Sequence, residues 1–206
     1  MTSEMTEAPV QVIAVSPADT LRWVKPDLLT RLLPFAIVVA AAWFIWRPAW
    51  LGISVGDLRW QLGFGLAGLP LMFVLATLLQ LPLSRRRGAL RVGSGPDVVL
   101  EAGFYLLNGP LEEGFFRGLV QGGLGLLLGA PAGFLIGTAG YVLYHRLGGW
   151  TWADVAATAL AGISLGLAFW LLPGPPSLLG VSLAHVGATC GFLGPGPYLL
   201  RRLRLI

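Results

Sequence analysis

Long apolar stretches, separated by short polar or glycine- and proline-containing segments, occupy most of the chain after residue 31. There are six of them, at residues 32–53, 60–83, 97–128, 131–147, 152–172 and 177–194. A helix rises about 1.5 Å per residue and needs about 20 apolar residues to cross a bilayer, so each stretch is at or near that length. The pattern predicts an all-α, polytopic transmembrane helical bundle of about six spans, folded as a single domain over residues 31–200.

The third stretch raises an alternative of seven spans. Residues 97–128 are too many for one straight span, and Gly109-Pro110 lies near their middle. Proline kinks or breaks a helix, so the stretch divides into two helices if the chain turns there. Pro110 would then be the first residue of the second helix, and Glu112 would lie in its first turn.

Basic residues gather at the ends of the apolar stretches and favour six spans. The main clusters are Arg22, Lys25 and Arg31 before the first stretch, residues 84–87 after the second, and residues 201–204 at the end of the chain. With a cytoplasmic N-terminus, six spans place all of them on the cytoplasmic side, as the positive-inside rule requires, whereas seven would place the last cluster outside.

The same reasoning predicts where the protein resides and how its ends are arranged. We expect a multi-pass protein of the cell membrane with a cytoplasmic N-terminal tail over residues 1–30. A basic C-terminal tail, residues 201–206, is expected on the same side.

The composition agrees with a membrane protein. Charged residues make up 12% of the chain and hydrophobic residues 55%, whereas a soluble globular domain carries about 25% charged residues. The net charge of +4 comes from the basic clusters at span ends, so it indicates topology and not a nucleic-acid partner. The single cysteine, Cys190, excludes an internal disulfide.

Glycines recur every four residues in three of the apolar stretches. Small residues on one stripe of a membrane helix allow close approach of a neighbouring helix. The sequence therefore predicts close packing at these glycines: Gly114, Gly118 and Gly122, then Gly133 and Gly137, then Gly162 and Gly166.

Three carboxylates lie in the interior of the apolar stretches and not at their ends: Glu101, Glu112 and Glu113. An ionisable group at bilayer depth costs at least about 2.5–3.5 kcal/mol, so it is expected to face a cavity or a partner. Arg117 lies one helical turn after Glu113, in the favourable acid-first order, which predicts an ion pair. Glu112 is rotated about 100° away from Glu113 and is left to point elsewhere.

The only two histidines also lie in late apolar stretches. His145 follows Tyr141 by one turn, and His185 precedes Thr189 by one turn. Counted at about 1.5 Å per residue from the turn near residues 129–131, Glu112 and His145 lie at similar depths, about 25 and 21 Å away. The sequence predicts that Glu112, His145 and His185 converge in one pocket in the cytoplasmic half of the bundle.

One carboxylate and two imidazoles have three chemical uses. They bind a divalent metal as a His₂Glu set with an open position for water. Without metal, the glutamate deprotonates a water while a histidine stabilises the oxyanion. In a transporter, they relay protons. Composition and spacing leave these open.

Three short motifs resemble those of one protein family. "LEEGFFRG" (111–118), "YVLYH" (141–145) and "SLAHVGAT" (182–189) follow one another in the order typical of the CPBP family. These are the CAAX-processing and bacteriocin-processing (Abi) intramembrane endopeptidases. The resemblance covers residues 100–194 and implies hydrolysis of a peptide bond within or near the membrane.

The resemblance also implies roles for single residues. Glu112 matches the general base that activates water, and His145 matches the residue that holds this water with it. Glu113 and Arg117 match a structural pair, and His185 matches an oxyanion-stabilising residue. Thr189 stands where the family usually has asparagine, and its hydroxyl is a shorter hydrogen-bond donor.

The expected reaction needs no cofactor, with zinc held by Glu112, His145 and His185 as the alternative. The implied partners are the lipid bilayer and a membrane-associated peptide or protein. Its cleaved segment is expected to be a C-terminal sorting signal, a leader peptide or a CAAX-like tail, and the composition suggests a bacterial source. A non-catalytic membrane scaffold or a small transporter with the same fold is the alternative function.

Overall fold

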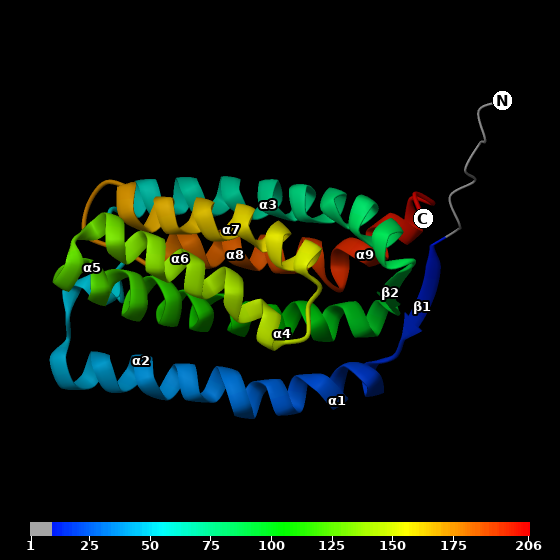
Figure 1. Ribbon diagram of the computed structural model, residues 1–206, viewed down its shortest axis with the longest axis horizontal. Coiled ribbons are helices and arrows are strands. Elements are labelled where there is room, and N and C mark those ends of the chain that lie inside the picture. The colour runs from blue at the N-terminus through cyan, green and yellow to red at the C-terminus, as the bar shows by residue number, and fades with distance from the viewer. Residues whose placement is uncertain (1–9) are drawn as a thin grey trace.

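The computed structural model describes residues 10–206, and most of them are helical (Figure 1). The prediction of an all-α bundle is confirmed. The elements in chain order are β1 (Gln11–Val15), α1 (Pro17–Asp27), η1 (Leu28–Leu32), α2 (Leu33–Trp46), η2 (Ala49–Leu51), α3 (Leu58–Arg87), β2 (Ala89–Gly93), α4 (Gly95–Glu113), η3 (Gly114–Gly122), α5 (Gly123–Leu128), α6 (Ala130–Leu147), α7 (Trp152–Leu171), α8 (Leu179–Phe192) and α9 (Pro195–Arg202).

Three helices in the described part of the chain are long and apolar enough to cross a membrane. They are the continuous helix Pro17–Trp46, which joins α1, η1 and α2, then α3 and α7. The helix α8 is apolar but shorter. These helices indicate a membrane protein, while the count of six spans and the cytoplasmic position of the two ends stay predictions.

The N-terminal segment, expected to be a tail over residues 1–30, is folded where the structure describes it. Residues 1–9 lie outside the described residues, and Gln11–Val15 forms a parallel two-stranded sheet with Ala89–Gly93. The first helix begins at Pro17 because Ser16 caps it, with a reciprocal hydrogen bond from Asp19. Residues 11–15 and 17–27 are therefore regular secondary structure, while the cytoplasmic position of this segment stays a prediction. At the other end, α9 extends to Arg202, so the basic tail predicted over residues 201–206 begins inside a helix.

The predicted break at Pro110 is wrong. From Gly95 to Leu128 the chain is helical throughout, with Pro110 inside α4 and a π-helical segment, η3, directly after Glu113. A proline removes one backbone donor, and neighbouring groups in a membrane bundle satisfy the freed carbonyl. Glu112 therefore lies at an α-to-π junction, and the seven-span alternative loses the break on which it rested.

Glycines set the separation of the helices. The predicted stripes are confirmed as close contacts except at Gly114, whose added side chain would meet its nearest neighbour at an ordinary 3.4 Å. A side chain at Gly162 would meet Tyr141 at 3.1 Å, and one at Gly166 would meet Thr138 at 2.8 Å. The most extensive helix contact joins α3 and α8. There Gly187 and Gly191, which belong to no predicted stripe, lie against the backbone of α3.

Candidate active site

His185 lies between the two adjacent glutamates. Glu112 and Glu113 are the last residues of α4, and His185 comes from the middle of α8; all three are buried. The His185 Nδ1 atom is 2.7 Å from Glu113 Oε1, and Nε2 is 3.3 Å from Glu112 Oε2. Each ring nitrogen therefore faces a different carboxylate.

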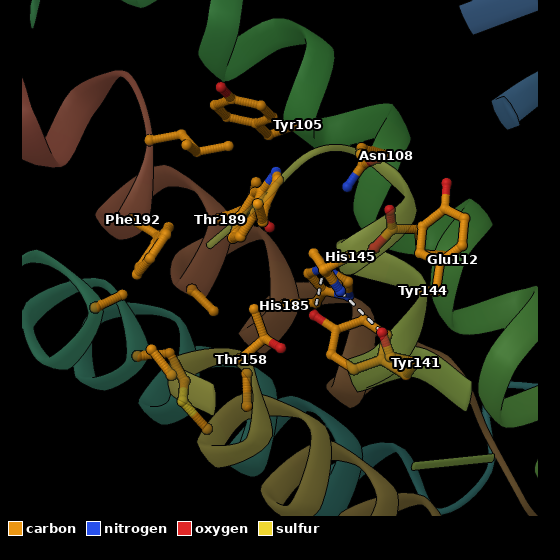
Figure 2. Close-up of a pocket in the computed structure, with 18 of the residues that line it drawn as sticks. Tyr105, Asn108, Glu112, Tyr141, Tyr144, His145, Thr158, His185, Thr189 and Phe192 are labelled. Atoms are coloured by element: carbon orange, nitrogen blue, oxygen red, sulfur yellow. Dashed lines mark hydrogen bonds and ion pairs between the residues drawn. The ribbon is translucent and has the colours of Figure 1, made fainter. Parts of the chain in front are cut away.

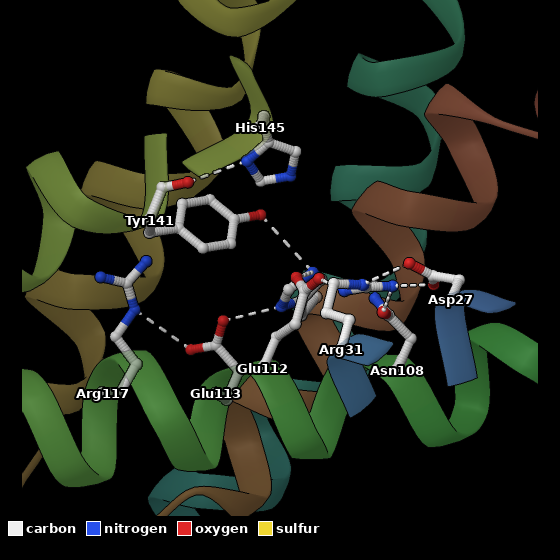
Figure 3. Close-up of polar contacts among 9 residues, drawn as sticks. Asp27, Arg31, Asn108, Glu112, Glu113, Arg117, Tyr141 and His145 are labelled. Atoms are coloured by element: carbon white, nitrogen blue, oxygen red, sulfur yellow. Dashed lines mark hydrogen bonds and ion pairs between the residues drawn. The ribbon is translucent and has the colours of Figure 1, made fainter. Parts of the chain in front are cut away.

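The predicted ion pair of Glu113 and Arg117 is present. Arg117 Nε lies 3.2 Å from Glu113 Oε2, and neither side chain is exposed (Figure 3). Arg117 also donates to Thr138 Oγ1 at 3.4 Å, and its guanidinium lies 4.9 Å from the centre of the Tyr141 ring. The pair spans one turn across the α-to-π junction and anchors the carboxylate that holds His185.

His145 is oriented by its own helix. Its Nδ1 lies 2.8 Å from the Tyr141 backbone carbonyl oxygen, one turn earlier in α6. Because a carbonyl only accepts, Nδ1 carries the proton, and Nε2 of the neutral ring is left as an acceptor. The rings of Tyr141 and Trp150 pack against the imidazole edge-on, each 4.9 Å from its centre.

One cavity of about 900 Å³ joins the predicted residues. Glu112, His145, His185 and Thr189 all line it, and Figure 2 shows them on α4, α6 and α8. The structure thus brings together four of the six predicted site residues around one space. Glu113 and Arg117 do not line the cavity and lie behind His185.

Arg31 is the residue that the sequence did not assign to the site. It forms an ion pair with Glu112 and another with Asp27, and its Nη2 donates to Asn108 Oδ1 at 2.7 Å (Figure 3). Two spacings carried the signal: Asp27 lies one turn before Arg31, and Asn108 lies one turn before Glu112. In the sequence alone, Arg31 is one of the basic residues that indicate the membrane topology.

The zinc alternative stays a prediction, and in this structure its three residues face other partners. Within residues 10–206, no group of three or more histidine, cysteine, aspartate or glutamate side chains is placed to hold a metal ion. Both His185 nitrogens face carboxylates, and the His145 Nδ1 faces a carbonyl. Glu112, His145 and His185 therefore do not present three donors to one point.

Comparison with known proteins gives a family match over part of the chain. Residues 95–190 match the family model described as type II CAAX prenyl endopeptidase Rce1-like, which confirms the resemblance seen in the sequence. The matched segment contains Glu112, Glu113, Arg117, His145, His185 and Thr189, and not Arg31. Neither a search of curated proteins nor a search of solved structures gave a match.

Proposed function

We propose that the chain, whose residues 95–190 match the Rce1-like family model of type II CAAX prenyl endopeptidases, is an intramembrane endopeptidase that hydrolyses its substrate with water activated by Glu112. The family is a protease family whose substrates are membrane-associated peptides or proteins. The proposal concerns the mechanism, the residues and the substrate of this chain.

One observation carries the proposal: a buried carboxylate and two histidines share a large, mostly apolar cavity. A cavity of about 900 Å³ has room for several residues of a peptide. Apolar walls with a few placed polar groups are typical of ligand sites. Two carboxylates line it, Asp27 and Glu112, and Glu112 is the one that lies beside His185 and serves as the base.

The first step transfers a proton from water to Glu112. The Nε2 lone pair of His145 accepts the second hydrogen bond of that water, since Nδ1 of this ring is already donating. The hydroxide attacks the peptide carbonyl, and Glu112 then gives its proton to the leaving amine. Arg31 and Asn108 hold Glu112 in position, because Arg31 contacts both side chains.

The oxyanion is stabilised from α8. The imidazole of His185 lies between two carboxylates, and its Nε2–H is released from Glu112 when Glu112 takes the proton from water. It then donates to the oxyanion. Thr189, one turn further along α8 and lining the same cavity, supplies a second donor through its hydroxyl. No metal takes part in this scheme.

The substrate class is a membrane-associated protein or peptide. A C-terminal sorting signal, a leader peptide and a CAAX-like tail each present an extended segment next to an apolar anchor. The apolar lining of the cavity would contact the anchor, and the polar side chains of α4 that line it would form hydrogen bonds with the backbone of the extended segment.

The test replaces the base without changing its shape. We expect Glu112→Gln to fold normally and to cleave at least about 100-fold more slowly, because general-base catalysis contributes that much or more. Cleavage is measured in detergent with fluorogenic forms of the three candidate substrates. Asp57→Asn is the matched control, since it removes a carboxylate at the N-cap of α3 and asparagine caps equally well.

Two results would contradict the proposal. Equal cleavage by the wild-type and Glu112→Gln proteins would exclude Glu112 as the base. Loss of wild-type cleavage on chelation, with recovery on addition of zinc, would replace the metal-free scheme by a metal-bound water. A folded wild-type protein that cleaves none of the substrates would favour the scaffold or transporter.

A further inference from the structure

A line of buried polar side chains follows one face of α4. Asp97, Glu101, Tyr105, Asn108 and Glu112 are each less than 9% exposed. Their spacings of four, four, three and four residues place them on a single helix face. The face leads from the start of α4 to the proposed base near its end. Figure 1 shows that α4 begins beside β2. A membrane helix keeps such a face only where it meets a cavity or partners.

Two cavities meet along this face. The first is the cavity of the candidate active site, and the second, of about 460 Å³, is lined by Asp97, Glu101 and Tyr105. Six residues line both: Trp23, Tyr105, Gly148, Trp150, Phe192 and Leu193. The two cavities are therefore adjacent compartments of one path along α4.

The second cavity contains buried polar groups that lack partners. Asp97 is fully buried, and neither of its carboxylate oxygens has a hydrogen-bond partner among residues 10–206. The Tyr105 hydroxyl lies in the same cavity, and Tyr105 is 1% exposed. An unpaired buried carboxylate lowers the stability of the fold, and a second acid, Glu101, lies beside it. A cation bound between the two acids would offset this cost.

Two arginines, Arg87 and Arg91, line this cavity, and neither forms an ion pair with Asp97 or Glu101 in the described part of the chain. Arg87 donates to Asp154 Oδ1 at 3.0 Å and also to Gln80. Arg91 is exposed on β2. Two carboxylates are also fewer than the three protein ligands typical of a bound metal. A cationic side chain fits this cavity better.

We propose that Asp97 and Glu101 form an acidic subsite for a lysine or arginine side chain of the peptide substrate. The proposal rests on the proposed peptidase function and adds a substrate preference to it. Glu101 precedes Glu112 by eleven residues of α4, which is about 16 Å along the helix. An extended peptide advances about 3.3 Å per residue, so the basic residue lies about five residues from the scissile bond.

The experiment measures peptide binding to the Glu112→Gln protein in detergent, so that no cleavage interferes. The probes are fluorescent twelve-residue peptides rich in leucine and alanine, with one lysine moved along the sequence. Each is compared with the peptide that has glutamine at the same position. We expect one lysine position, or two adjacent ones, to bind about tenfold more tightly or better, as for a buried charge-assisted hydrogen bond.

Variants of the two acids identify the subsite. Adding Glu101→Gln, or Asp97→Asn, should abolish the lysine preference while glutamine peptides bind as before. Glu101→Lys should also abolish it, because the new ammonium pairs with Asp97 in place of the substrate lysine. The melting temperature of the Glu101→Gln and Asp97→Asn variants should equal or exceed that of the parent Glu112→Gln protein, since each substitution removes an unpaired buried charge. Asp57→Asn, distant from both cavities, should leave the preference unchanged.

Three outcomes would overturn the subsite. In the first, no lysine peptide binds better than its glutamine counterpart. In the second, the preference persists when both acids are replaced. In the third, Glu101→Gln weakens all peptides equally and lowers the melting temperature, which indicates a structural role. Because binding is measured without cleavage, failure of the subsite is distinguished from failure of the peptidase function.

Discussion

Glu112 is contacted from two sides by helices that are fixed in different ways. On one side, α8 carries His185 and packs against α3 through small residues. A side chain at Gly68 would meet the Ala184 Cβ at 2.9 Å, and Gly187 and Gly191 lie against the α3 backbone. On the other side, the N-terminal helix carries Arg31 and is placed mainly by side chains.

The N-terminal helix shows the contrast clearly. The Phe35 ring stacks on Phe115 with centres 4.1 Å apart, and Val39 would meet a side chain at Gly114 only at an ordinary 3.4 Å. Its polar link to the site is Arg31, which comes from the π-helical turn between α1 and α2. Figure 1 shows this helix along one side of the bundle.

The difference has a functional consequence. Backbone contacts at glycine leave no room for adjustment, so they fix the position of His185. Side-chain stacking and ion pairs break and form again without unfolding the bundle. We therefore expect changes near α8 to act mainly on folding, and changes at Arg31 to act mainly on the reaction.

The largest effect is expected at the buried pair behind His185. Arg117→Ala leaves Glu113 charged and fully buried without its partner, which costs about 3–5 kcal/mol of folding free energy. The loss should appear as a low folded yield and a lower melting temperature in detergent. The double variant Glu113→Gln/Arg117→Met is the control, and it should recover much of the yield because no charge is left unpaired. An unaltered melting temperature for Arg117→Ala would show that the pair does not support the fold.

A smaller effect is expected at the seam of α3 and α8. Gly187→Ala places a methyl group against the backbone at Leu69, which cannot move aside as a flexible side chain does. Overpacking of this kind costs about 1–3 kcal/mol. Gly63→Ala on α3 is the matched control, since nothing lies within 4 Å of its added Cβ. Equal melting temperatures for the two variants would mean that the seam is not closely packed.

The same contrast explains what the sequence predicted of the fold. The apolar stretch 152–172 and the helix Trp152–Leu171 differ by a single residue, because an apolar run reports burial or lipid contact directly. The first helix begins far earlier than its apolar stretch. Its first turns, Pro17–Asp27, carry mixed polar residues, and only the Ser16 cap marks their start.

The site was predictable to the extent that its residues lie in short motifs. The Glu113–Arg117 pair follows from helix spacing, and Glu112, His145 and His185 stand out as ionisable groups in apolar stretches. Arg31 lies 81 residues from Glu112, and nothing local links the two. A basic residue before a span is also explained by the positive-inside rule. The sequence alone therefore offers no reason to expect that Arg31 contacts Glu112.

The smallest effect on stability, with a clear effect on turnover, is expected for Arg31→Ala. The Arg31 side chain is 17% exposed, and without it Glu112 keeps His185 as a second partner. The loss should therefore cost less folding free energy than the loss of Arg117. The kcat should nevertheless fall about tenfold at unchanged KM, because a misoriented base raises the barrier by roughly 1.4 kcal/mol. Arg31→Lys should recover only part of the rate, since an ammonium lacks the planar fork that reaches Asn108 and Glu112 together. Arg22→Ala is the matched control on the same helix, where the side chain is 81% exposed. If Arg31→Ala instead melts as early as Arg117→Ala, or cleaves as fast as Arg22→Ala, the N-terminal helix does not contribute to the reaction as we propose.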